Sequence, residues 1–273
     1  MNARGTVVVT GTSSGIGAAT ANLLSEQGWR VIGLDRRAGD TPLDTFLACD
    51  LTEPDAIDRA VAAIDGPIHG LVNVAGVPGS LDGETVMRVN LLGLRHLTET
   101  LMPAMAPGGA VIHIASGAGS GWRDNLPQVR SLLAERSFAD GLVWVRSQAM
   151  SGPQAYNFSK EAVIVYALLG SMLWRAHGVR SLSLSPGVVE TPILKDFEDT
   201  MGKAVLERLR DQSGGRNGTP GDIAPVIAFL LSPEAAWING TDLGVDGGSE
   251  VAIALGLLDC RADEAADLFL STL

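Results

Sequence analysis

Short apolar runs rich in β-branched residues alternate along this chain with longer stretches in which hydrophobic residues recur at helical spacing. That alternation predicts consecutive βαβ units and a parallel sheet. Several runs, such as residues 71–75 (LVNVA), are almost continuously apolar, as expected for strands covered on both faces. The predicted strands are Thr6–Thr10, Arg30–Asp35, Thr45–Ala48, Ile68–Val74, Ala110–Ala115, Arg180–Ser185 and Leu243–Val245. The predicted helices lie near Gly15–Gln27, Pro54–Ile64, Gly83–Met102, Pro153–His177, Phe197–Gln212 and Pro220–Leu231.

One stretch interrupts this alternation before the helix that begins near Pro153. It spans residues 117–153, about 37 residues, which is too long for a structureless loop in a compact domain. Residues 128–136 (QVRSLLAER) favour a helix, and an apolar run follows at residues 141–145. We therefore expect a single α/β domain over residues 1–273, a Rossmann-type, doubly wound, parallel sheet of seven strands with helices on both faces. Residues 117–153 are expected to form an inserted lid.

The composition suits a globular protein and argues against several kinds of partner. A hydrophobic content of 46% is sufficient for a sizeable core. The formal charge is −11 and no basic cluster is longer than Arg36-Arg37, which argues against nucleic-acid or anionic membrane partners. Cys49 and Cys260 are too few for a disulfide framework, and the four histidines show no metal-ligand spacing. We expect a reduced compartment and no bound metal.

The beginning of the chain shows no feature of a targeting segment. Residues Met1–Gly5 lead directly into the first predicted strand, without the apolar core and cleavage site of a signal peptide. No apolar run reaches the ~18 residues that a membrane-spanning helix requires. These features predict a soluble, cytoplasmic protein.

Three glycines follow the first predicted strand and open the first predicted helix. Gly11, Gly15 and Gly17 stand in residues 10–17 (TGTSSGIG). In such a turn, backbone N–H groups and the positive end of the helix can face a pyrophosphate. A glycine-rich turn is a weak signal by itself, and an ordinary strand-to-helix turn is the alternative. The flanking strand favours dinucleotide binding.

Asp35 ends the second predicted strand, 35 − 11 = 24 residues after the first of these glycines. An acidic residue at this distance is expected to bind the adenosine ribose and to favour NAD. At ~5 Å and an effective dielectric constant of ~20, a like charge costs about 3 kcal/mol, which disfavours the 2′-phosphate of NADP. Arg36 and Arg37 work against this preference, because an arginine can offset the repulsion. Ser14 is not basic, so NAD is the expected cofactor.

Small and polar residues also follow the third and fourth predicted strands. Asp50-Leu51 comes after the third, and Asn73-Val74-Ala75-Gly76 ends the fourth. Ligands of doubly wound sheets bind at these strand ends, where small residues let a cofactor lie against the backbone. Ordinary turn chemistry explains either segment equally well when it is taken alone.

Tyr156 and Lys160 lie four residues apart in a predicted helix and therefore share one face of it. A phenol normally has a pKa near 10 and is a poor base at neutral pH. A positive charge at ~4 Å, with an effective dielectric constant of ~20, is worth about 4 kcal/mol, or roughly three pKa units. Lys160, together with the positive ring of an oxidised nicotinamide, is thus expected to bring the pKa of Tyr156 to roughly 7. Such a tyrosine can act as the general base or acid of hydride transfer.

In combination, these motifs make the chain resemble the short-chain dehydrogenase/reductase family from about Thr6 to Gly248. The shared motifs are residues 10–17, Asn73-Val74-Ala75-Gly76, Asn90, Ser116, Tyr156-x3-Lys160, Pro186-Gly187, Thr191-Pro192 and Asp246-Gly247-Gly248. The resemblance implies a catalytic tetrad of Asn90, Ser116, Tyr156 and Lys160. In this tetrad Ser116 orients the substrate oxygen, Lys160 also holds the nicotinamide ribose, and Asn90 supports a water that passes protons to Lys160.

The resemblance also completes the expected cofactor site. It adds Ile16, the backbone of Val189 and the hydroxyl of Thr191 to the residues already named. The expected cofactor-binding residues are Gly11, Ser14, Gly15, Ile16, Gly17, Asp35, Arg36, Asp50, Leu51, Asn73, Ala75, Gly76, Tyr156, Lys160, Pro186, Gly187, Val189 and Thr191.

Ser116 and Tyr156 are 156 − 116 = 40 residues apart, a longer separation than in most of the family. The insertion resembles that of coniferyl-alcohol dehydrogenases and of bacterial 3α-hydroxysteroid dehydrogenase/carbonyl reductases, and the former group matches more closely. The walls near the chemistry are expected to be apolar. They are expected to come from Gly117–Trp122, Trp144, Met150 and Ile193–Met201. The alternative is that Trp122 and Trp144 only pack the insertion.

The sequence therefore predicts NAD-dependent oxidation of an aromatic allylic or otherwise hydrophobic alcohol to its carbonyl. A 3α-hydroxysteroid dehydrogenase/carbonyl reductase is the alternative within this class. A non-catalytic dinucleotide-binding module is a remote alternative, against which the complete tetrad argues. By resemblance we expect a homodimer or homotetramer, although the insertion lies beside the helices through which relatives assemble. The apolar segment Val251–Leu273 is expected to cover a neighbour or the mouth of the active site.

Overall fold

The computed structural model describes residues 4–255, and its centre is a parallel sheet of seven strands. The strand order is β3-β2-β1-β4-β5-β6-β7, and neighbouring strands pair in parallel. The order of the strands reverses between β1 and β4, which confirms the predicted doubly wound sheet. The strands are β1 Thr6–Thr10, β2 Arg30–Asp35, β3 Thr45–Ala48, β4 Ile68–Asn73, β5 Met105–Ile114, β6 Arg180–Pro186 and β7 Asp242–Val245.

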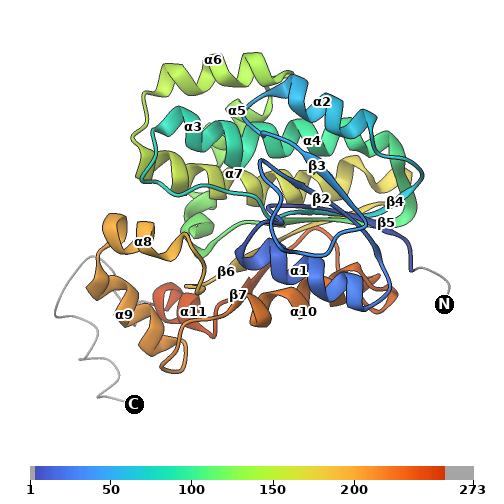
Figure 1. Cartoon of the computed structure of the whole chain (residues 1–273). Coiled ribbons are helices and arrows are strands. Elements are labelled where there is room, and N and C mark those ends of the chain that lie inside the picture. The colour runs from blue at the N-terminus through green and yellow to red at the C-terminus, as the bar shows by residue number, and fades with distance from the viewer. Residues whose placement is uncertain (1–3, 256–273) are drawn as a thin grey trace.

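Helices cover both faces of the sheet (Figure 1). On one face lie α2 Pro54–Ala62, α3 Gly83–Met87, α4 Leu94–Leu101 and α7 Gly152–Leu173, and on the other α1 Gly15–Glu26 and α10 Pro220–Leu231. Val8 of β1 packs with the first set, whereas Val7 and Val9 pack with the second, because successive strand residues point to opposite faces. All three valines are fully buried, which explains why the strand is continuously apolar.

The predicted helix Gly83–Met102 is divided into three parts. α3 is capped by Asp82, whose side chain accepts a hydrogen bond from the backbone N–H of Thr85 at 2.9 Å. The segment Arg88–Gly93 is a π-helix, and α4 follows it. Gly93 lies so close to the carbonyl oxygen of Leu51 that a Cβ at this position would overlap it. The π segment therefore packs directly against the loop that follows β3.

The insertion forms helices α5 Leu126–Leu133 and α6 Phe138–Gln148, after a 3₁₀ segment at Gly117–Arg123. α5 confirms the helix predicted at residues 128–136, and the apolar run at 141–145 belongs to α6. Both helices lie on the outer side of α3 and α7 (Figure 1). Trp144 stacks on Phe158 of α7, with ring centroids 5.6 Å apart and an interplanar angle of 12°. The insertion is thus anchored to the helix layer.

Besides small shifts at other element ends, two further predicted elements differ clearly from the structure. The expected helix Phe197–Gln212 is two helices, α8 Leu194–Met201 and α9 Lys203–Gln212, because Gly202 between them has a φ of +87°. β5 begins at Met105 instead of Ala110, through a register shift in its pairing with β4. That early pairing joins Met105 to Ile68 and is not visible in the apolar pattern.

The described residues end with helix α11, Ser249–Ala254, followed by residue 255. Most of the segment Val251–Leu273, which we expected to cover a neighbour or the active-site mouth, lies outside the described residues. Within residues 4–255, none of the helices combines the length and the hydrophobicity needed to cross a membrane.

Candidate active site

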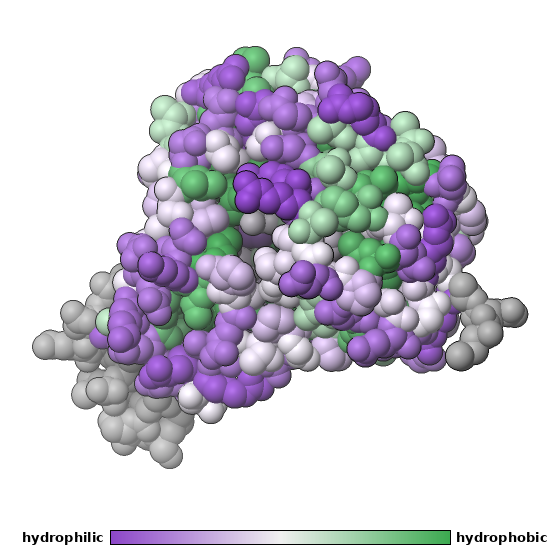
Figure 2. Space-filling view, in the orientation of Figure 1, coloured by the Kyte–Doolittle hydropathy of each residue, from purple (hydrophilic) through white to green (hydrophobic). Residues whose placement is uncertain are grey.

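A cavity of about 570 Å³ lies at the carboxyl ends of the strands, within the roughly 300–1,000 Å³ typical of ligand pockets. Figure 2 shows a hollow near the centre of this face of the molecule. Every predicted cofactor residue except Asn73 lines the cavity, and so does Ser116. The fold therefore brings together residues that are up to 191 − 11 = 180 positions apart in the sequence.

The glycine-rich turn forms the middle of the cavity wall. Gly11 and Gly15 have φ values of +74° and +56°, a backbone region that favours glycine. A Cβ on Gly17 would overlap the carbonyl oxygen of Gly11, so the first turn of α1 approaches β1 closely. The N-terminal N–H groups of α1 can consequently face an anion in the cavity. This arrangement fits the pyrophosphate of a dinucleotide.

Asp35 lies at one end of the cavity with its carboxylate fixed by backbone donors. Its Oδ2 accepts a hydrogen bond from the N–H of Ser13 at 3.0 Å, and its Oδ1 accepts one from the N–H of Arg36 at 2.7 Å. Arg36 also lines the cavity, whereas Arg37 does not. The negative charge of Asp35 therefore has a set position beside the dinucleotide site.

Tyr156 and Ser116 lie at the other end of the cavity, on α7 and at the end of β5. Tyr156 keeps part of its surface open to the cavity, yet burial raises its pKa to about 12. A hydrogen bond with Ser116 acts in the opposite direction and lowers this pKa. Ser116 also accepts a hydrogen bond from the N–H of Ala118 at 3.2 Å, which fixes its side chain.

Lys160 is 6% exposed, and its Nζ donates a hydrogen bond to the carbonyl oxygen of Ile114 at 3.0 Å. Burial lowers its pKa to about 8. The ammonium is 5.7 Å from the centroid of the Tyr156 ring. In the chain alone, burial dominates and raises the Tyr156 pKa. The expected pKa of roughly 7, which also depends on the positive nicotinamide ring, stays a prediction.

Asn90 lies in the π segment, behind the cavity wall, and is 1% exposed. Its Oδ1 accepts a hydrogen bond from the N–H of Val77 at 2.8 Å, and its Nδ2 donates to the carbonyl oxygen of Val77 at 3.0 Å and to Ser159 at 3.3 Å. A Cβ on Gly76 would be 3.4 Å from Asn90 Oδ1 and 3.7 Å from Lys160 Nζ. Asn90 thus fixes the loop after β4 beside Lys160. Its support of a water stays a prediction.

Asn73 is the predicted cofactor residue that the fold places elsewhere. It is 2% exposed, and its Nδ2 donates a hydrogen bond to Thr98 at 3.0 Å and lies 3.1 Å from Nδ1 of His113. Burial lowers the pKa of His113 to about 3, so this ring is neutral and can accept from Asn73. The side chain of Asn73 therefore joins the sheet to α4 and does not line the cavity.

The walls near Tyr156 come from two loops and from α8. Val77, Leu81, Ile193 and Phe197 line the cavity, and the Phe197 ring meets the Tyr156 ring edge-on at 5.3 Å and 64°. Ile193 and Phe197 belong to the predicted wall Ile193–Met201. The loop after β4 was missed, because its apolar residues look like ordinary loop residues.

The insertion does not contribute to these walls. Residues 117–153 are all described, and none of them lines the cavity. Trp122 packs under the guanidinium of Arg123 at 4.4 Å, and Trp144 packs on α7. The expected wall contributions of Gly117–Trp122, Trp144 and Met150 are therefore wrong for this cavity, and the packing alternative for both tryptophans is the better account.

One polar contact between two cavity residues was not predicted from the sequence. Ser80, in the loop after β4, donates a hydrogen bond to Oδ1 of Asp196 on α8 at 2.7 Å. Both residues line the cavity, and 116 positions separate them in the chain. Such a distant polar pair leaves no signal in a single sequence. Among the described residues, no group of three or more His, Cys, Asp or Glu side chains is placed to hold a metal ion.

Comparison with known proteins places this chain in a family. The family model described as short chain dehydrogenase matches residues 5–127, and the one described as Enoyl-(Acyl carrier protein) reductase matches residues 142–250. A coniferyl-alcohol dehydrogenase from a Pseudomonas species is 38% identical over 247 residues, which cover 89% of this chain and 95% of the relative. The 3-alpha-hydroxysteroid dehydrogenase/carbonyl reductase of Comamonas testosteroni is 30% identical over 257 residues, 90% of this chain and 97% of the relative.

A solved structure agrees with these relatives. The crystal structure of the 3-alpha-hydroxysteroid dehydrogenase from Pseudomonas sp. B-0831 complexed with NADH has a TM-score of 0.78 and 31% identity, over 93% of this chain and 100% of that chain. The sequence relatives and the structure relative match nearly the whole chain, in agreement with the Rossmann-type sheet described above. The chain therefore belongs to the short-chain dehydrogenase/reductase family of oxidoreductases.

Proposed function

We propose that this protein interconverts a hydrophobic, aromatic allylic alcohol and its carbonyl compound by NAD-dependent hydride transfer, with Tyr156 as the acid/base. The observation that carries the proposal is the position of Ser116, Tyr156 and Lys160 at one end of a dinucleotide-sized cavity. The glycine-rich turn and Asp35 line the remainder of this cavity. A nicotinamide cofactor supplies a hydride acceptor or donor when it is bound. The residues of the chain supply orientation and proton transfer.

Each residue at this end has a separate role in the proposed reaction. The Ser116 hydroxyl holds the substrate oxygen next to Tyr156 by hydrogen bonding. Tyr156 accepts the alcohol proton as the hydride leaves the carbinol carbon, and it returns that proton when the carbonyl is reduced. Lys160 and the positive charge of the oxidised nicotinamide favour the phenolate, which is needed because burial alone raises the pKa of Tyr156 to about 12.

The preference for NAD rests on Asp35. Replacing Asp35 with asparagine keeps a hydrogen-bond acceptor for Ser13 but removes the charge that disfavours a 2′-phosphate. Because that repulsion is about 3 kcal/mol, we expect kcat/KM with NADP to rise roughly 100-fold. Steady-state kinetics with both cofactors measures this change, and Asp40→Asn, at an exposed site that does not line the cavity, is the control. Unchanged discrimination in Asp35→Asn would remove Asp35 from cofactor selection.

The substrate class rests on the walls near Tyr156. The surface is apolar and consists of Val77, Leu81, Ile193 and Phe197, with the Phe197 ring packed against the Tyr156 ring. Such a surface suits a flat, hydrophobic alcohol better than a sugar. The similarity to a coniferyl-alcohol dehydrogenase supports the same class. The similarity to 3-alpha-hydroxysteroid dehydrogenases supports the alternative, an alicyclic alcohol or ketone.

A substrate panel separates these candidates. We expect reduction of NAD at 340 nm with coniferyl and cinnamyl alcohols, at a kcat/KM at least about tenfold above that for 3α-hydroxysteroids, a ratio that corresponds to roughly 1.4 kcal/mol. Turnover of steroids without turnover of cinnamyl-type alcohols would favour the alternative. A chain that binds NADH but oxidises nothing in the panel would instead point to the non-catalytic dinucleotide-binding module.

We also propose that the protein forms a homo-oligomer. Met172 and Leu173 at the end of α7 are 72% and 66% exposed, and Trp237 is 99% exposed. Gly240 lies against Ser171, so the segment that follows Trp237 passes beside this end of α7. Exposed apolar side chains of this size are typical of contact surfaces. Light scattering of the full chain tests the mass, and a monomer at all concentrations would contradict the assignment.

A further inference from the structure

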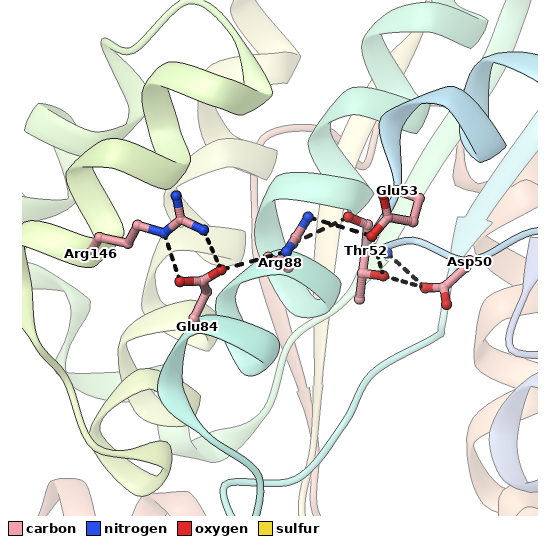
Figure 3. A network of polar contacts seen from close by, with 6 residues as sticks. All are labelled: Asp50, Thr52, Glu53, Glu84, Arg88 and Arg146. Atoms are coloured by element: carbon pink, nitrogen blue, oxygen red, sulfur yellow. Dashed lines mark hydrogen bonds and ion pairs between the residues drawn. The ribbon is translucent and has the colours of Figure 1, made fainter.

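Arg88, the first residue of the π segment, joins separate parts of the chain beside the cofactor cavity (Figure 3). Its Nε donates a hydrogen bond to the carbonyl oxygen of Thr52 at 3.2 Å. Its two terminal nitrogens pair with Glu53 and Glu84, each at 3.5 Å. The Arg88 side chain is 24% exposed. It therefore ties the loop after β3 to α3 from a partly buried position.

The loop that Arg88 holds forms one wall of the cavity. Asp50 and Leu51 line the cavity, and the N–H and hydroxyl of Thr52 donate to Oδ1 of Asp50 at 2.9 and 2.8 Å. The backbone N–H of Cys49 donates to the carbonyl oxygen of Asp35 at 2.9 Å. The loop thus lies beside Asp35, at the end of the cavity far from Tyr156. Arg88 fixes the residue that orients the Asp50 carboxylate.

The π segment touches the same loop at a second point. Gly93, its last residue, packs against the carbonyl oxygen of Leu51 without space for a Cβ. Asn90, between Arg88 and Gly93, binds Val77 in the loop after β4. One short segment consequently holds both the loop of Asp50 and the loop beside Lys160. Of the two contacts between this segment and the loop of Asp50, the one made by Arg88 can be removed by a side-chain substitution, whereas Gly93 has no side chain.

We propose that Arg88 is a positioning residue for the adenosine half of the dinucleotide, acting through Thr52 and the Asp50 loop. This inference rests on the proposed NAD dependence, which places adenosine at the Asp35 end of the cavity. Without Arg88, the Thr52 carbonyl loses its donor and the loop gains freedom that cofactor binding must then remove. The carboxylates of Glu53 and Glu84 also lose their shared positive partner, so the wall becomes more negative toward an anionic ligand.

The outer part of the network reaches the insertion. Arg146 on α6 donates two hydrogen bonds to Glu84, from Nε at 2.8 Å and from a terminal nitrogen at 2.9 Å, and these bonds lower the pKa of Glu84. The Arg146 side chain is 58% exposed, and exposed ion pairs contribute little by themselves. We therefore assign the effect on the cofactor to Arg88, through its contact with the Thr52 carbonyl and its charge, and not to Arg146.

The test compares fragments of the cofactor, using calorimetry on the full-length protein. In Arg88→Met we expect the Kd of ADP-ribose to rise about tenfold, the range of one charge-assisted hydrogen bond. The Kd of reduced nicotinamide mononucleotide stays within about twofold of wild type, and kcat at saturating NAD falls less than about twofold, because the contacts at Tyr156 are untouched. Arg88→Lys, which keeps the charge but not the Nε donor, gives an intermediate Kd and covers the case in which Arg88→Met fails to fold.

Arg95→Met is the matched control. Arg95 lies on α4, is similarly buried at 17% exposure, and pairs with Glu99 at 2.7 Å, so its loss leaves ADP-ribose affinity unchanged. An unchanged ADP-ribose Kd in both Arg88 variants, or equal weakening of both fragments, overturns the assignment of Arg88. A wild-type chain that binds neither ADP-ribose nor NADH overturns the cofactor proposal itself, so the two failures are distinguishable.

Discussion

Replacing Tyr156 with phenylalanine is expected to lower kcat for alcohol oxidation by about 10²- to 10⁴-fold, the usual contribution of a positioned acid/base. The substitution removes the phenolic oxygen that exchanges the proton but leaves the ring against Phe197. NADH affinity should therefore stay within about twofold of wild type, because most of the cavity wall is intact. Stopped-flow absorbance at 340 nm and fluorescence titration with NADH measure the two quantities.

The chain provides a matched control for this experiment. Tyr166 is the second of its two tyrosines, lies on the same helix, is 4% exposed and does not line the cavity. Tyr166→Phe should retain kcat within about twofold, since this hydroxyl does not contact the proposed reaction centre. An equal loss in both variants would mean that the helix, and not the Tyr156 hydroxyl, determines the rate.

Replacing Lys160 with methionine is expected to change both kcat and the pH dependence of folding stability. The pKa of Lys160 is lowered from 10.5 to about 8, so between these values the unfolded chain binds the extra proton and folding stability rises with pH. The shift is equivalent to about 3 kcal/mol. Relative to Lys160→Met, the free energy of unfolding of wild type should therefore rise by up to about 3 kcal/mol as the pH increases from 8 to 10.5. The variant should also lose about 100-fold in kcat, because the lysine charge no longer favours the phenolate.

Urea unfolding at several pH values measures the difference between the two proteins. Other groups that titrate in this range are common to both, so they cancel in the comparison. Lys203→Met is the control, because the Lys203 side chain is 77% exposed and is not desolvated by the fold. A constant stability difference between wild type and Lys160→Met from pH 8 to 10.5 would show that the Lys160 ammonium is not buried as described.

The sheet and the dinucleotide end of the site were predictable because they depend on local patterns. A strand covered on both faces must be apolar along its length, as Val7, Val8 and Val9 are. A close approach of α1 to β1 requires Gly17. Tyr156 and Lys160 meet the cavity together because four residues make about one helical turn. These features need no knowledge of distant partners.

The remaining features depend on tertiary contacts that a single sequence does not display. The π segment packs through Gly93 on the Leu51 carbonyl. The side chain of Asn73 binds Thr98 and lies beside His113, and it does not line the cavity. The insertion was expected at the substrate wall, whereas Trp144 stacks on Phe158 of α7. Burial raises the pKa of Tyr156 in the chain without a cofactor, and a single sequence shows the neighbouring charge but not this burial.

Deuterium transfer tests the central claim most directly. Wild-type protein is mixed in excess with NAD and coniferyl alcohol that carries two deuterium atoms on the carbinol carbon, and the nucleotide is analysed by mass spectrometry after one turnover. We expect one deuterium in each NADH formed by wild type, and a rate in Tyr156→Phe lower by about 10²-fold or more. Unlabelled NADH from wild type, or transfer at the same rate in Tyr156→Phe, would contradict hydride transfer with Tyr156 as the acid/base.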